Sequence, residues 1–222
     1  MHNKYKSSEE NVYMLEAFSF RLRRPKYCGL PKRLLDIAVA ASGLIIAAPL
    51  MALCALAIWM EGGGPVLFKQ SRVGADRCSF ICYKFRTMST DAPRDCATSE
   101  LDRPEQYITH VGRFLRRTSL DELPQLFNVL KGDMSLIGPR PVIEAERELV
   151  GLRDDLGVYS IRPGMTGLAQ IRGRDVVSIR RKAAYDAQYV EQMSFGYDLA
   201  LFWRTLINVV LCRNVREGRP NV

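Results

Sequence analysis

The chain has 222 residues, enough for one domain with an appendage. Its 32 Lys and Arg residues outnumber 24 Asp and Glu residues, and the net charge of +8 favours anionic partners such as nucleic acid, a phospholipid surface or phosphorylated small molecules. The six Cys residues lack Cys-x-x-Cys spacing, which disfavours a zinc site or a disulfide framework. With only two His residues, a serine triad or His-based metal site is also disfavoured, so carboxylates must supply acid–base or nucleophilic chemistry.

Residues 37–60 form an uncharged apolar run. As a straight helix the run would be about 36 Å long, enough to cross a bilayer core of about 30 Å. Pro49 lies near its middle, where it removes a backbone hydrogen bond and kinks the helix. Basic residues flank both ends, whereas a spanning helix usually carries them on one side. We therefore expect a re-entrant helix–break–helix that returns to the cytoplasm, with a spanning anchor as the alternative.

The start of this segment carries charge. Asp36 follows Lys32 by one turn, which indicates either an i,i+4 ion pair at the membrane surface or a solvated helix start. The basic cluster at residues 21–33 either binds anionic phospholipid headgroups or acts as an orientation signal. We divide the chain into a basic tail (1–30), a re-entrant membrane helix (31–60) and a cytoplasmic, membrane-associated domain (61–222).

The remaining pattern predicts an α+β fold, mostly helical with a small β-hairpin. The hairpin pairs residues 66–70 with 80–85 across a Gly-containing turn, and 88–106 are expected to form a surface loop. The last helix has an apolar stripe that either lies on the membrane or, more commonly, packs on the core. Helices are predicted at residues 111–117, 122–132, 142–152, 178–193 and 198–212, with Gly132 ending the second and turns over 161–174.

Adjacent carboxylates, Asp121 and Glu122, follow this hairpin in the stretch LDELP. One interpretation is structural: Ser119 caps a helix and Glu122 reaches back to complete a capping box. Pro124 weakens it, because the proline would then delete a hydrogen bond inside the helix. The other interpretation is a phosphate-handling site. The carboxylates would bind Mg²⁺ or supply a nucleophile, and neighbouring arginines would clamp phosphate through paired hydrogen bonds.

A resemblance bears on these alternatives. KRLLDI before the apolar run and its central proline, then YKFRTM, LDELPQLFNVLKGDMSLIGPRP and RPGMTGLAQIRGR, occur in this order. The series resembles the monotopic phosphoglycosyl transferases, bacterial enzymes that act on polyprenol phosphate. The resemblance extends over residues 31–212, and the LDELPQ to GPRP portion is its most specific part.

The resemblance implies that a phospho-sugar is transferred from a UDP-sugar to undecaprenyl phosphate, with release of UMP. Asp121 would be the nucleophile that forms a phosphosugar–aspartyl intermediate, and Glu122 its dyad partner. Mg²⁺ is the expected cofactor, with Asp121 among its ligands. Arg116, Arg140 and Arg174 match phosphate-binding positions. The enzyme would act at the cytoplasmic face of the bacterial inner membrane and initiate an exopolysaccharide or another surface glycan.

The implied partners are the UDP-sugar, undecaprenyl phosphate and an anionic phospholipid membrane, without nucleic acid; a homodimer is compatible with the resemblance. Ala48 precedes Pro49 where the family often has Ser, so the break is expected to depend on the proline alone. The short leading segment suggests the compact form of the family. Two rivals remain: a non-enzymatic basic membrane adaptor, and a membrane-anchored nucleotide-sugar hydrolase that transfers to water.

Overall fold

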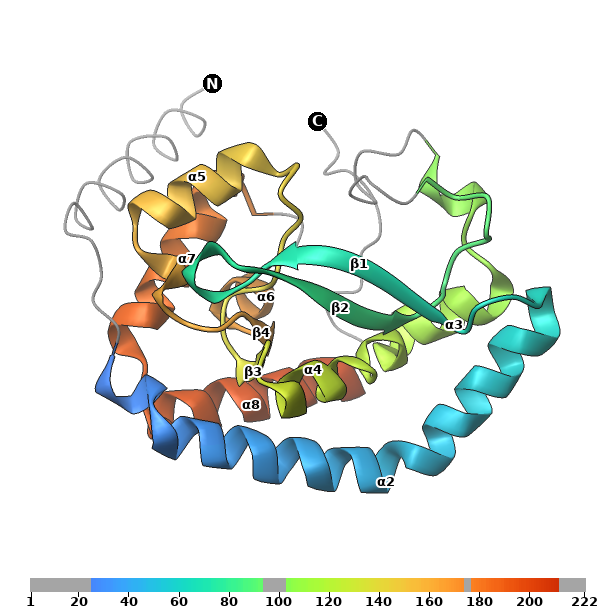
Figure 1. Cartoon of the computed structure of the whole chain (residues 1–222), viewed down its shortest axis with the longest axis horizontal. Helices are drawn as coiled ribbons and strands as arrows, with labels where there is room; N and C mark the ends of the chain where they lie inside the picture. Colours follow the sequence, from blue (N-terminus) through green and yellow to red (C-terminus); the bar gives the residue numbers. More distant parts are fainter. Residues whose placement is uncertain (1–24, 94–102, 174–176, 212–222) are drawn as a thin grey trace.

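The computed structural model describes residues 25–93, 103–173 and 177–211 (Figure 1). The described part is mostly helical with two small sheets, which confirms the α+β prediction. The helices are α2 (Leu30–Gly62), α3 (His110–Thr118), α4 (Gln125–Lys131), α5 (Arg147–Asp155), α6 (Leu168–Arg172), α7 (Ile179–Gln192) and α8 (Phe195–Val210). The strands are β1 (Leu67–Val73), β2 (Ser79–Phe85), β3 (Ser135–Ile137) and β4 (Gly164–Thr166).

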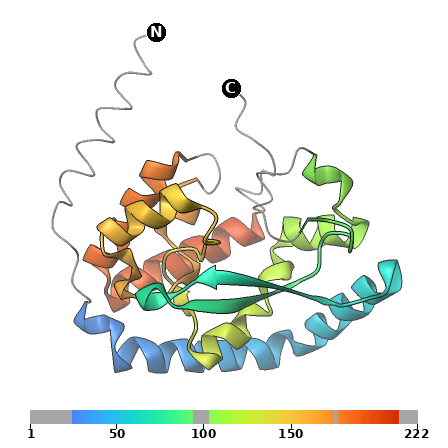
Figure 2. The ribbon, with the colours of Figure 1, turned by 45° about the horizontal axis from the view of Figure 1, so that its top comes forward.

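Helix α2 dominates the architecture. It runs from Leu30 to Gly62 without interruption and contains Pro49, so the predicted break is a bend within one helix. Figures 1 and 2 show the other elements gathered on its concave side. Only 11% of its most apolar window is buried, although its mean hydropathy there is 2.3. A core helix of a soluble protein would bury such a segment, so α2 is instead suited to a membrane by length and composition.

The N-terminal end of α2 is tied to the domain by buried charges. Lys32 forms an ion pair with Asp198 of α8, and both side chains are about 5% exposed or less. Asp36 accepts hydrogen bonds from the hydroxyl of Ser135 and the backbone N–H of Leu136, each at 3.1 Å. The solvated helix start is wrong, because Lys32 and Asp36 are both buried. Burial raises the pKa of Asp36 and the charge of Lys32 opposes this rise, so the expected attraction is present, but the ion pair of Lys32 is with Asp198 and lies inside the protein. Buried charges need such partners to offset their desolvation.

The C-terminal end of α2 is tied to the same domain. The Glu61 carboxylate accepts hydrogen bonds from the backbone N–H groups of His110 and Val111, the first at 2.6 Å, and so caps the first turn of α3. Arg86 donates to the carbonyl oxygen of Gly63 at 2.6 Å. Both ends of the apolar helix therefore contact one folded unit.

The predicted hairpin is confirmed. β1 and β2 pair antiparallel, with Leu67 opposite Phe85 and Val73 opposite Ser79. The free edge of β2 is covered by α4, because the buried Asn128 side chain accepts from the N–H of Tyr83 and donates to the carbonyl of Ile81. An amide side chain thus supplies the two hydrogen bonds that a third strand would make. This contact holds α4 and the segment before it against the hairpin.

Several other boundaries differ from the sequence prediction. The second sheet, parallel and formed by β3 and β4, was not predicted. A Cβ atom at Gly164 would lie 2.1 Å from the backbone nitrogen of Gly138, so this close pairing requires glycine. Gly132, with φ of 99°, ends α4 as expected. α5 begins at Arg147 and not at residue 142, because 142–146 form irregular backbone.

The last helix also departs from the more common expectation. Leu201 is buried in the main core with Tyr189 and Val190 of α7, and Phe202 packs against that core. Leu199, Trp203 and Leu206 are instead exposed, with Trp203 at 56%. Core packing is therefore wrong for these three members of the predicted stripe, which present an apolar face to the surroundings.

Candidate active site

The two adjacent carboxylates lie in a tight connection between α3 and α4. Ser119 adopts a left-handed conformation with φ of 59°, which ends α3 and redirects the chain. A single turn of 3₁₀ helix, η5 (Leu120–Glu122), follows, and Pro124 stands directly before α4. The Ser119 side chain makes no cap hydrogen bond, so the capping-box interpretation is wrong. The caps of η5 and α4, Ser119 and Pro124, make no side-chain cap hydrogen bond, so helix capping does not explain the adjacent carboxylates.

Glu122 is held by two cations from different parts of the fold. Lys84 of β2 and Arg140 of the loop after β3 each donate to the same Glu122 oxygen at 3.0 Å. The Glu122 side chain is only 14% exposed, so these charge-assisted bonds fix its position. Lys84 was not predicted as a site residue. The motif YKFRTM, which contains Lys84 and is part of the resemblance, could have indicated its role.

Asp121 has a different environment. In the part of the chain described, its carboxylate accepts no hydrogen bond, and the side chain is half-buried. Burial, and then the negative charge of Glu122, raise the pKa of Asp121 to about 6, against the opposing influence of nearby Lys84, Arg116 and Arg140. An ionised Asp121 is thus a poorly solvated carboxylate with oxygens that accept no hydrogen bond from the described residues. These are properties of a nucleophile or of a metal ligand.

Arginines surround the pair. Arg116, near the end of α3, donates to the hydroxyl of Thr87 at 2.8 Å. Arg140 is the most open, with 41% of its side chain exposed. Both predicted arginines therefore lie beside Asp121. The third, Arg174, lies outside the described residues.

A further arginine was missed by the sequence analysis. Arg72 of β1 donates to the carbonyl of Pro141 at 3.2 Å and to the Gln70 side chain. Burial, followed by the charge of Arg140, lowers the pKa of Arg72, while Glu122 has the opposite effect. From the sequence, Arg72 was assigned only to the basic residues that follow the apolar run. The neighbouring residues do not indicate that the alternation of side chains along β1 turns Arg72 towards the site.

The site therefore combines two carboxylates with four cations: Arg72, Lys84, Arg116 and Arg140. This excess of positive charge, in partly buried surroundings, suits a ligand with several phosphate oxygens. Predominantly apolar side chains with one or two polar groups would instead indicate a neutral ligand. The chemistry favoured is phosphoryl-group handling with a carboxylate nucleophile.

The donor set also fits Mg²⁺. No cluster of three or more His, Cys, Asp or Glu side chains occurs among the residues the structure describes. Mg²⁺ needs no such cluster, because it is commonly held by one or two carboxylates together with substrate phosphates and water. Asp121, whose oxygens accept no hydrogen bond within the described ranges, fits this role better than Glu122, which is engaged by Lys84 and Arg140.

Comparison with known proteins decides the class. A family model described as bacterial sugar transferase matches residues 27–212. This chain belongs to the bacterial sugar transferase family. The match confirms the resemblance noted in the sequence and the prediction of an enzyme, a phosphoglycosyl transferase, and it argues against a non-enzymatic membrane adaptor.

Characterised relatives are similar over most of this transferase. It is 38% identical over 201 residues to the exopolysaccharide production protein ExoY of Rhizobium meliloti, covering 83% of this chain and 88% of the relative. It is 42% identical over 194 residues to the UDP-glucose:undecaprenyl-phosphate glucose-1-phosphate transferase of Caulobacter vibrioides, covering 83% and 72%. The undecaprenyl-phosphate galactose phosphotransferase of Salmonella typhimurium is 42% identical over 201 residues, covering 82% of this chain and 41% of the relative.

Proposed function

We propose that this enzyme transfers a phospho-sugar from a UDP-sugar to undecaprenyl phosphate through a phosphosugar–aspartyl intermediate, with release of UMP. The names of its relatives support the acceptor and the type of donor, since they include glucose and galactose phosphotransferases acting on undecaprenyl phosphate. Two relatives named for exopolysaccharide production support a role in initiating an exopolysaccharide or another surface glycan.

The covalent route divides the reaction into two displacements at one phosphorus atom. An Asp121 oxygen attacks the β-phosphorus of the donor, a phosphorus–oxygen bond to Asp121 forms, and the bond to the bridging oxygen breaks as UMP leaves. A phosphate oxygen of the acceptor then attacks the same phosphorus and the Asp121 carboxylate departs. Two steps suit a water-soluble donor and a lipid acceptor, because the two substrates need not occupy the site together.

The surrounding cations supply electrostatic stabilisation. Arg116 and Arg140 lie beside the attacking carboxylate, where they would bind phosphate oxygens of the donor and stabilise developing charge. Lys84 and Arg140 hold Glu122, which would orient the acceptor phosphate next to the nucleophile. Mg²⁺, with Asp121 as a ligand, would neutralise phosphate charge when bound.

Helix α2 would hold this site at the level of the lipid headgroups. Both of its ends contact the same folded unit, through Lys32 at one end and Glu61 at the other. A helix tied in this way is suited to enter one leaflet and return, with the domain at the cytoplasmic face of the bacterial inner membrane. In a Cys-free background, Lys26→Cys and Pro65→Cys should both react with a membrane-impermeant maleimide from the cytoplasmic side only. Labelling from opposite sides would refute the re-entrant topology.

The observation that carries the chemical proposal is the half-buried Asp121 carboxylate, which accepts no hydrogen bond from a described residue and lies among cations. Purified enzyme should release UMP from UDP-glucose or UDP-galactose without acceptor, in an amount stoichiometric with enzyme. Sugar-labelled donor should leave label on the polypeptide, and Asp121→Asn should abolish both signals. Multiple turnover to free sugar phosphate in the absence of lipid would instead indicate the hydrolase. Transfer with no donor-only release would indicate direct transfer without an enzyme-bound intermediate.

A further inference from the structure

The segment that carries Asp121 and Glu122 has a second regularity. Leu120, Leu123 and Leu126 recur every third residue, so in the turn η5 and the start of α4 they point away from the two carboxylates and into the protein interior. The three leucines belong to or pack against two clusters that contain different parts of α2, and their order along the chain follows the helix backwards across its bend.

Leu126 packs against the first half of α2. It belongs to a hydrophobic cluster with the buried Ala40, and Leu44 packs against the same cluster. Gly43 faces Leu126 so closely that a Cβ atom on the glycine would lie 3.4 Å from Leu126 Cδ1. The first half of the helix, before Pro49, is therefore fitted to the start of α4.

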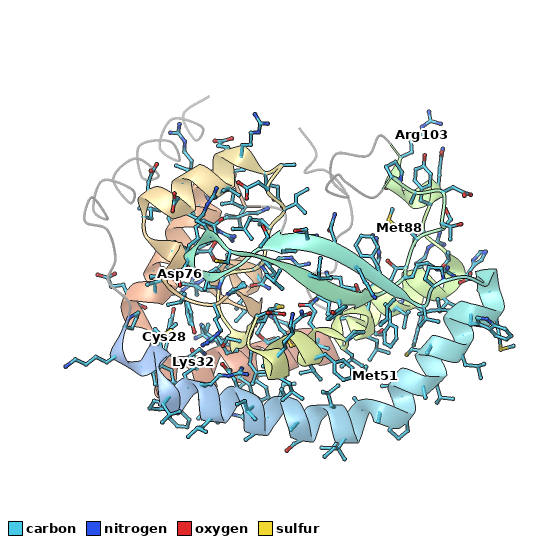
Figure 3. The ribbon with its side chains drawn as sticks, viewed as in Figure 1. Cys28, Lys32, Met51, Asp76, Met88 and Arg103 are labelled. Atoms are coloured by element: carbon cyan, nitrogen blue, oxygen red, sulfur yellow. The ribbon has the colours of Figure 1, made fainter. Side chains whose placement is uncertain are left out.

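Leu120 packs against a cluster that joins the second half of α2 to Phe85 of β2 and Leu115 of α3. Its cluster contains the buried Cys54 and Ile58, and Met51 and Ala55 also pack against this cluster. Figure 3 shows Met51 on the concave side of the helix, near its bend. The turn that carries the carboxylates therefore packs against a cluster to which the part of the helix after Pro49 contributes Cys54 and Ile58.

Leu123 packs against both clusters, and among the described residues it is the member they share. It lies one residue after Glu122 and two after Asp121. Any change in the angle between the two halves of α2 would move the two clusters relative to each other and shift Leu123. Because packed interiors transmit small displacements, the adjacent carboxylates would move with it.

We propose that Leu123 is a positioning residue for Asp121: it joins the two halves of the bent membrane helix to the catalytic turn, so that the bend in α2 determines where the nucleophile lies. This inference rests on the proposed role of Asp121. In this proposal the helix α2 has two functions: it anchors the protein, and it supports the nucleophile during the reaction.

The test compares steady-state kinetics of detergent-solubilised full-length variants, with UDP-glucose and UDP-galactose as donors and undecaprenyl phosphate at saturation. Leu123→Ala should lower kcat by about tenfold or more, since a misplacement of about 1 Å can cost about a hundredfold, while KM for the donor changes less than about twofold. Leu123→Met should recover most of kcat, because methionine adapts to the space between two clusters.

Leu152→Ala supplies the matched control. Leu152 is also a partly buried leucine that packs against a cluster, but it lies on α5 and in the main core. Its truncation removes similar packing at a distance from Asp121 and should leave kcat within about twofold. If Leu123→Ala has the same kcat as Leu152→Ala, the inference is overturned.

A second pair of variants tests the support of this segment by α2 at the contact between Gly43 and Leu126, in case Leu123→Ala does not fold. Gly43→Leu should overlap Leu126 and lower kcat, whereas Gly43→Ala places its Cβ at ordinary contact distance and should be active. Equal activity of the two Gly43 variants would count against the inference. Asp121→Asn separates the two proposals: if it remains active the proposed nucleophile is wrong, and if it is inactive while Leu123→Ala is fully active only the positioning role is wrong.

Discussion

Replacing the proposed nucleophile should make the protein more stable while it abolishes activity. Burial and the Glu122 charge raise the pKa of Asp121 from 3.8 to about 6, so at pH 8 the folded protein holds an ionised carboxylate that is better solvated in the unfolded chain. A difference of about 2 pKa units corresponds to about 3 kcal/mol at most. Because the side chain is only half-buried, solvent screening reduces this, and we expect about 2 kcal/mol.

Asp121→Asn removes that charge. For a chain of this size, about 2 kcal/mol raises Tm by about 4–8 °C. Thermal unfolding in detergent micelles with EDTA present would measure the difference at pH 8. The folded pKa lies above the unfolded value, so the cost is absent below about pH 4 and complete above about pH 6. The advantage of Asp121→Asn should therefore shrink as the pH is lowered from 8 to 4.

Asp155→Asn, on an exposed carboxylate at the end of α5, is the control and should leave Tm nearly unchanged. An unchanged or lower Tm for Asp121→Asn at pH 8, or an advantage that does not vary with pH, would show that the wild-type charge is not desolvated. The Asp121 carboxylate would then not be activated by burial.

Three more predictions concern the rate and the anchor. The rate of donor-only UMP release should fall below about pH 6, as Asp121 becomes protonated. Glu122→Gln removes a neighbouring negative charge, so it should move this fall in rate to lower pH. A fall at the same pH in the variant would contradict the effect of Glu122 on the pKa of Asp121. EDTA should abolish transfer and added Mg²⁺ should restore it, whereas full activity in chelator would remove the metal from the proposal. Lys32→Met should lower Tm by about 10 °C, because the unpaired buried charge of Asp198 costs about 3–5 kcal/mol, whereas the exposed Lys26→Met should not.

Local chemistry allowed part of the fold to be predicted from sequence. The β1–β2 hairpin follows from two strand-like runs separated by a turn, and Gly132 ends α4 because the position has a positive φ. The apolar length of residues 37–60 predicted a long apolar helix, whereas the break expected at Pro49 is a bend within the continuous helix α2. These features depend on neighbouring residues, so a single sequence contains enough information to locate them.

Contacts between segments that are distant in the sequence could not be predicted from neighbouring residues. Lys32 was expected either to pair with Asp36 one turn away or to be solvated, but it forms a buried ion pair with Asp198, 166 residues later. Lys84 reaches Glu122 across 38 residues, and Arg72 approaches the site through the register of a strand pair. Motif resemblance located Asp121, Glu122, Arg116 and Arg140, whereas the charges that surround them depend on tertiary packing.

The same separation has a consequence for biosynthesis. α2 leaves the ribosome long before α8, which carries the Asp198 that neutralises Lys32. During most of translation Lys32, in the first turn of the helix, must therefore stay hydrated, and the depth of this end in the lipid stays adjustable. We expect the position of α2 in the lipid to become fixed only when α8 docks and Asp198 pairs with Lys32. The C-terminal helix therefore completes the insertion of the N-terminal one.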